Sequence, residues 1–118
     1  MGRRSTIELE RRFNRRYDIR LPLHYRVSQR GAPPRSGTGM TYDLSTSGVA
    51  FHCRRPLPVG AHIEMSIAWP VKYQDAYPVD LLITGLIMRS ESGRTVARMT
   101  SHKLRADMVE AEPRRVSA

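Results

Sequence analysis

The sequence of 118 residues has the length of one compact domain, and 40% of its residues are hydrophobic, enough to fold around a core. Its formal net charge of +9 indicates an anionic partner, such as nucleic acid, a nucleotide or a membrane surface. The single cysteine excludes an internal disulfide and fits a reducing, cytoplasmic setting, and no apolar run reaches the about 18 residues that a membrane-spanning helix needs.

Arginine dominates the basic residues, since only Lys72 and Lys103 are lysines among 20. Genomic base composition is enough to explain that preference, but it does not explain why the arginines crowd the N-terminus. Residues 1–19 combine many arginines with few apolar residues, and the spacing of Ile7 and Phe13 is poor for a helix. We therefore expect residues 1–19 to form a flexible basic arm, with a short helix over residues 6–16 as the alternative.

Alternation of apolar and polar residues begins at Arg20 and predicts a half-buried strand over 20–27. Residues 29–39 are rich in glycine and proline and are expected to form a loop. Two further short strands are predicted over 40–45 and 48–54, the second with Cys53 on its buried face.

The second half of the chain continues in the same pattern. A turn is predicted over 55–60, followed by a strand over 62–69 with Trp69 on its apolar face. Residues 70–78 are expected to form a loop bounded by prolines. A long strand bent at Gly85 is predicted over 79–92. A last strand over 94–101 carries Arg94 and Arg98 on a solvated face, and a short helix is predicted over 103–112.

Six short strands with turn signals between them predict an all-β fold, a small antiparallel barrel or closed sandwich. We expect the basic arm at 1–19, a single β-barrel domain at 20–112 and a disordered tail at 113–118.

Two short motifs carry the functional signal. Arg16 and Arg20 precede the first strand, and a D-x-S-x-x-G turn, Asp43 to Gly48, joins the second strand to the third. Taken by itself, the second motif is better explained as a plain hairpin turn capped by Asp and Ser. Arginine, however, matches the O6/N7 edge of guanine and binds phosphate as a fork, and a carboxylate accepts from the opposite, N–H-bearing edge. Together the two motifs suit a guanine nucleotide.

The order and spacing of Arg16-x-x-x-Arg20 and Asp43-x-Ser45-x-x-Gly48 resemble the two-part signature of the PilZ domain family over residues 12–105. The resemblance implies a six-stranded antiparallel β-barrel, usually with a C-terminal helix. It also implies a bacterial receptor for cyclic di-GMP, a ligand rather than a cofactor.

The resemblance implies a role for each motif residue. Arg16 and Arg20 match the pair that grips phosphates and guanine edges, Asp43 and Ser45 match the pair that reads guanine, and Gly48 matches the glycine that closes the turn. Arginine at Arg15 implies two stacked ligand molecules per chain. The same arginine spacing occurs at Arg11/Arg15 and Arg12/Arg16; we choose Arg16/Arg20 because Arg20 opens the strand.

Other function classes have less support. The sequence has no nucleophile–base pair, paired carboxylates or phosphate-binding loop, so we expect neither an enzyme nor a catalytic residue, and the scattered histidines predict no metal site. The alternatives are a basic barrel that binds RNA or single-stranded DNA, for which aromatic residues are few, and an adaptor that binds only protein. A receptor of this kind needs an effector protein, which the sequence does not identify.

Overall fold

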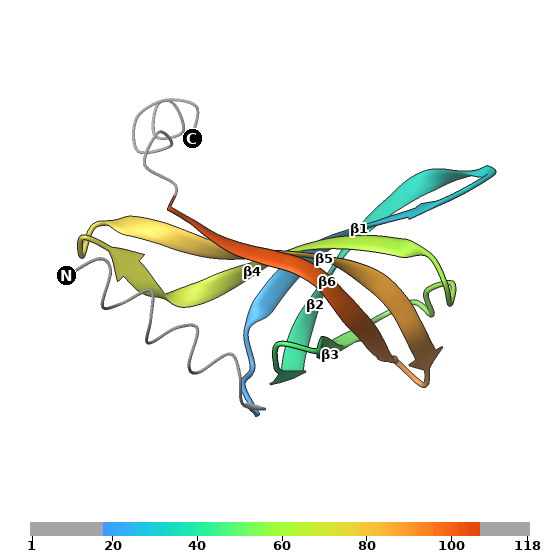
Figure 1. The fold of residues 1–118 in the computed structure, drawn as a ribbon. Helices are drawn as coiled ribbons and strands as arrows, with labels where there is room; N and C mark the ends of the chain where they lie inside the picture. Colours follow the sequence, from blue (N-terminus) through green and yellow to red (C-terminus); the bar gives the residue numbers. More distant parts are fainter. Residues whose placement is uncertain (1–17, 107–118) are drawn as a thin grey trace.

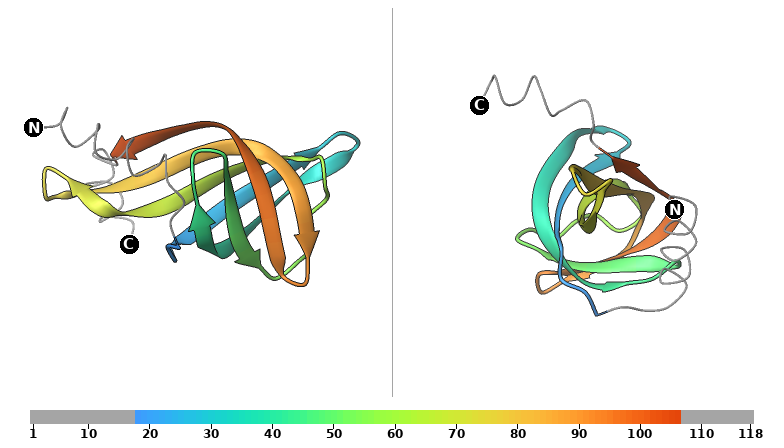
Figure 2. Two further views of the ribbon diagram at one scale, coloured as in Figure 1. Left: turned by 60° about the horizontal axis from the view of Figure 1, so that its bottom comes forward. Right: turned by 90° about the vertical axis from the view of Figure 1, so that its left-hand side faces the viewer.

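The computed structural model describes residues 18–106, which form six antiparallel strands. They are β1 (Pro22–Gln29), β2 (Ala32–Leu44), β3 (Gly48–Cys53), β4 (His62–Tyr73), β5 (Tyr77–Glu91) and β6 (Arg94–Ala106). Their order around the sheet is β1-β2-β3-β6-β5-β4, and β4 pairs back to β1, which closes a barrel (Figure 1; Figure 2, right). The predicted all-β, six-stranded antiparallel barrel is confirmed.

Period-two alternation places one face of each strand inside this barrel. On β1, Leu23, Tyr25 and Val27 are buried while His24 and Arg26 are exposed. The predicted apolar faces of β3 and β4 are also buried, including Cys53, and Trp69 is half-buried and packs against the core. The core therefore fills the barrel, and any ligand site has to lie on its outer wall or at its ends.

The expected loop over 29–39 is wrong, because β2 already begins at Ala32. The turn between β1 and β2 is confined to Arg30 and Gly31, and Gly31 has a positive φ of 82°. The prolines misled the prediction. The start of β2 pairs with β1 alone, since its pairing with β3 begins only at Gly39. Pro33 and Pro34 fall in the irregular interval between the Val27–Arg35 and Gln29–Ala32 pairs, where they interrupt no regular ladder.

The expected loop over 70–78 is also mostly strand. β4 continues to Tyr73 and β5 starts at Tyr77, so a long hairpin extends beyond the barrel (yellow, Figure 1). Gln74 and Asp75 both have positive φ values, 54° and 58°, as in the primed turns that suit a twisted hairpin. Pro70 lies in the irregular interval between the Trp69–Val79 and Tyr73–Tyr77 pairs, where it interrupts no regular ladder.

The helix expected over 103–112 is wrong in its first part, because β6 continues through Lys103 to Ala106. The rest of that range lies outside the described residues, as do the predicted tail at 113–118 and residues 1–17 of the predicted arm. Where β5 pairs with β6, the register shifts between Thr84 and Gly85 because Thr100 is an extra residue in β6, and the bend expected at Gly85 stays a prediction.

Candidate ligand-binding site

The turn Ser45–Ser47 joins β2 to β3 and is fixed by its own polar groups. The amide of Ser45 donates to the carbonyl of Gly48 at 3.0 Å, and the amide of Ser47 donates to the Ser45 hydroxyl at 3.3 Å. The two serine hydroxyls are 2.9 Å apart. On the other side, the amide of Met99 in β6 donates to the carbonyl of Ser47. The Ser45 hydroxyl thus stabilises the turn and stays at the surface.

A β-bulge directs Asp43 to the outer wall of the barrel. Thr41 pairs with Phe51 and Asp43 pairs with Ala50, so Tyr42 is an extra residue in β2. Without this bulge, Asp43 would share the inward direction of the buried Thr41. The bulge instead leaves the Asp43 carboxylate half-buried beside the turn.

Thr41 connects the two sequence motifs. Its hydroxyl accepts a hydrogen bond from the amide of Leu21 at 2.8 Å and donates one to the carbonyl of Ile19 at 2.6 Å. Its own amide donates to the carbonyl of Leu21 at 2.9 Å. Arg20 lies between Ile19 and Leu21, so these bonds fix its backbone next to the strand that carries Asp43. Figure 1 shows the start of β1 beside the end of β2 at the same end of the barrel.

Of the arginines predicted to bind ligand, Arg20 is described and exposed, whereas Arg15 and Arg16 lie outside the described residues. The structure therefore brings together Arg20, Asp43, Ser45 and Gly48 at one end of the barrel. For Arg15 and Arg16 the assignment stays a prediction from the sequence.

Gly48 has a packing reason to be glycine. A Cβ atom on Gly48 would lie 2.7 Å from the carbonyl oxygen of Ala97 in β6, closer than real Cβ contacts allow. The sequence interpretation assigned this glycine to closing the turn. Contact between β3 and β6 is a sufficient reason for glycine at this position.

Next to the turn, the outer wall has a hollow of about 300 Å³. It is lined by the predicted Asp43, Ser45 and Gly48 and by residues that sequence reasoning missed: Tyr42, Ser47, Val49, Ala50, Arg89 and Val96. The Tyr42 ring lies 4.7 Å from the His52 ring, centroid to centroid, and the Arg94 guanidinium lies 5.3 Å from the Tyr42 centroid. Arg94 is exposed, as predicted, and it also borders this aromatic pair.

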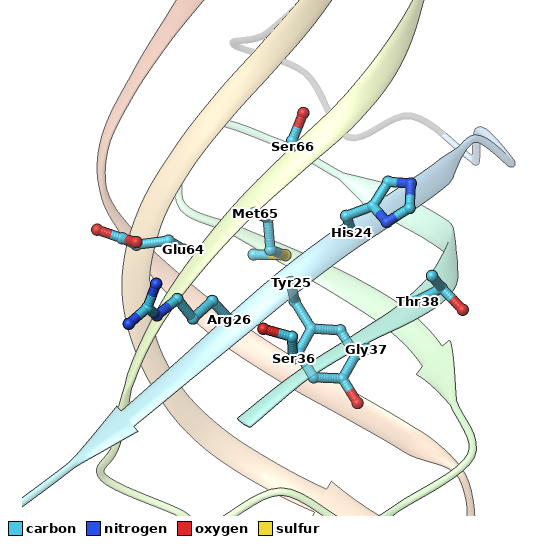
Figure 3. Close-up of a pocket in the computed structure, with 9 residues that line it drawn as sticks. All are labelled: His24, Tyr25, Arg26, Ser36, Gly37, Thr38, Glu64, Met65 and Ser66. Carbon is cyan, nitrogen blue, oxygen red and sulfur yellow. The ribbon is translucent and has the colours of Figure 1, made fainter. Parts of the chain in front are cut away.

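A larger hollow of about 580 Å³ lies elsewhere, on β1, β2 and β4 (Figure 3). Figure 3 shows the Tyr25 ring lying against Gly37, in the space that a Cβ atom on this residue would need. Its rim carries Arg26 and Glu64, which are paired neighbours on β1 and β4. None of the motif residues lines it, so we do not assign the predicted ligand to this hollow.

Two other kinds of site were sought within residues 18–106. No group of three or more His, Cys, Asp or Glu side chains is arranged to hold a metal ion there. The same residues include no helix that is long and apolar enough to cross a membrane.

Comparisons with known proteins agree with this architecture. The barrel is similar to the crystal structure of the PilZ domain of CeSA from a cellulose-synthesizing bacterium, with a TM-score of 0.55 and 19% sequence identity over 74% of this chain and 81% of that chain. At that identity the similarity shows the fold. No curated protein matches the sequence. The family model described as PilZ domain matches residues 10–106, which include both sequence motifs. The chain therefore belongs to the PilZ domain family.

Proposed function

We propose that this chain is a bacterial receptor for cyclic di-GMP, which binds between the arginine motif and the turn that follows β2. PilZ domains are known to bind cyclic di-GMP, and this supports a general receptor role. The observation that carries the proposal for this chain is the set of hydrogen bonds from Thr41 to Ile19 and Leu21, because they hold Arg20 at the barrel end that carries Asp43.

The chemistry of this barrel end suits a guanine nucleotide. Arg20 and Arg16 supply planar forks for phosphate oxygens and for the O6/N7 edge of guanine. The Asp43 carboxylate accepts from the N–H groups of a guanine, and Ser45 donates or accepts at the rim of the hollow. These roles are part of the proposal.

The proposal extends to the output of the receptor. Bound ligand neutralises the positive charge of the arm at 1–19 and draws Arg16 onto the face that carries Asp43. Arg15 meets a second, stacked cyclic di-GMP, which gives two ligands per chain. An effector protein then recognises the ordered arm. The domain acts as a binding module and not as an enzyme.

Calorimetric titration tests the proposal. Cyclic di-GMP should bind, and cyclic di-AMP should bind much more weakly, because adenine has an N6–H donor where guanine has the O6 acceptor. Absence of binding by folded protein would contradict the proposal. A random oligonucleotide is the control for non-specific attraction to the positive charge, and its binding should fall steeply with salt. If the oligonucleotide bound more tightly than cyclic di-GMP at physiological salt, a nucleic-acid function would be favoured instead.

A further inference from the structure

Two β-bulges lie on strands that flank β3 and β6. In β2, Tyr42 is the extra residue between the Thr41–Phe51 and Asp43–Ala50 pairs. In β5, Met88 is the extra residue between the Ile87–Ala97 and Arg89–Val96 pairs. Bulges of this kind redirect side chains and occur often beside functional sites.

Each bulge moves one charged residue from the inside of the barrel to the outside. Arg89 is an even number of residues from the buried Leu81, Ile83 and Ile87. In a regular strand it would therefore share their face and point into the core. The bulge at Met88 makes it exposed instead. Asp43 is redirected in the same way by the bulge at Tyr42.

The two redirected residues end in the same row of the sheet. Asp43 pairs with Ala50, Ala50 with Val96, and Val96 with Arg89. The row crosses β2, β3, β6 and β5, and all four residues line the hollow of about 300 Å³. An acid therefore lies at one end, an arginine at the other, and two small apolar side chains between them.

We infer that Arg89 is a ligand-binding residue that reads the O6/N7 edge of the guanine whose N–H edge binds Asp43, while Arg16 and Arg20 contact the phosphates and the second guanine. Ala50 and Val96 form the floor under the base. Three strand spacings of about 4.8 Å separate the ends of the row, or about 14 Å between backbones, which two side chains and a purine between them can span. The inference rests on the proposed function, and it adds a residue outside both sequence motifs.

Paired ligands and variants test this inference. The probes are cyclic di-GMP and its 7-deaza analogue, in which the N7 acceptor of each guanine is replaced by C–H. Arg89→Ala should weaken binding of cyclic di-GMP by about 5- to 150-fold, the range for one bidentate arginine–guanine contact. The parent should prefer cyclic di-GMP over the 7-deaza analogue, and this preference should be clearly smaller in Arg89→Ala, because only the contacts of the other arginines with N7 remain.

Arg26→Ala is the matched control, because it removes the same charge from an exposed position on β1, away from the hollow, and should leave binding unchanged. Arg89→Lys keeps the charge without the fork and should behave like Arg89→Ala. Full recovery by lysine would assign Arg89 to a phosphate and overturn the base contact. Parent-like binding by folded Arg89→Ala would overturn the inference while leaving the receptor function intact, whereas failure of the parent to bind would refute the function itself.

Discussion

Thr41 and Leu21 are joined by two hydrogen bonds: the Leu21 amide donates to the Thr41 hydroxyl, and the Thr41 amide donates to the Leu21 carbonyl. Thr41 is fully buried, and its hydroxyl also donates to the carbonyl of Ile19. A buried polar side chain normally needs such partners, and here the partners flank Arg20. The pairing therefore couples core packing to the position of a proposed ligand-binding arginine.

Replacing Thr41 tests that coupling. Thr41→Val removes the hydroxyl at nearly constant volume and leaves the Leu21 amide without its acceptor, which should lower the free energy of unfolding by about 1–3 kcal/mol. Cyclic di-GMP should bind more weakly because Arg20 loses its position. Thr41→Ser, which keeps the hydroxyl, should restore most of the affinity.

A double-mutant cycle separates positioning from general damage. If Thr41 acts through Arg20, adding Thr41→Val to Arg20→Ala should weaken binding little beyond Arg20→Ala alone. Additive losses measured by calorimetry would show that Thr41 affects the site by some route other than Arg20.

Arg20 and Asp43 are the described motif residues that should bind the ligand through charged groups. Arg20→Ala and Asp43→Ala should each cost about 1.5–3 kcal/mol of binding, or about 10- to 100-fold in affinity, as expected for hydrogen bonds to charged groups. Neither side chain belongs to the core, so thermal unfolding should change little. Unchanged affinity in both variants would place the ligand elsewhere on the barrel.

Substitution of Gly48 should lower the stability of the barrel itself, in contrast to Arg20→Ala and Asp43→Ala, which should lower affinity. Gly48→Ala places a Cβ atom against the Ala97 carbonyl and should destabilise the barrel by about 1–3 kcal/mol through overpacking. Urea unfolding without ligand measures this cost. A fully stable variant that has lost binding would instead support close approach of the ligand to the Gly48 backbone.

Tyr25 predicts how stability changes in alkali. Burial, followed by the neighbouring Cys53, raises the pKa of the Tyr25 phenol above its ordinary value of 10.0, although Arg35 and Arg55 oppose the shift. The unfolded chain then loses this proton at lower pH than the folded chain. The contribution to stability is complete below about pH 10 and is lost as the pH rises through the folded pKa. Tyr25→Phe should remove this part of the alkaline loss, as measured by urea unfolding across that range. An identical pH dependence in parent and variant would contradict the assignment.

The strand pattern was predictable because one face of each strand is buried, and period-two alternation records that face. The same rule failed where its premise failed. Pro33 and Pro34 look like loop residues, yet they lie within β2, in an irregular interval of its pairing with β1 where proline is tolerated. Period-two alternation also places Arg89 on the inner face of β5, because the sequence does not show the bulge at Met88 that turns it outward.

The candidate site was predictable only where its residues are close together in the sequence. Asp43, Ser45 and Gly48 stand close together in the sequence, so a motif can reveal them. Thr41, Ala50, Val96 and Arg89 come from four different strands, and only their register brings them to the site. A charged residue with inward parity, such as Asp43 or Arg89, is nevertheless a usable sign of a bulge.

The last prediction concerns the arm and the number of ligands. If bound cyclic di-GMP draws the arm onto the barrel, amides of residues 10–18 should exchange rapidly with solvent deuterium in the free protein and slowly in the complex. The Leu21 amide, which donates to Thr41, should be protected in both states, as should the strand interiors over 62–69 and 79–91. Equal protection of residues 10–18 in both states would mean that no ordering accompanies binding. The same samples give the stoichiometry: two ligands per chain in the parent and one in Arg15→Ala would support the stacked pair, whereas saturation of the parent at one ligand would remove the role proposed for Arg15.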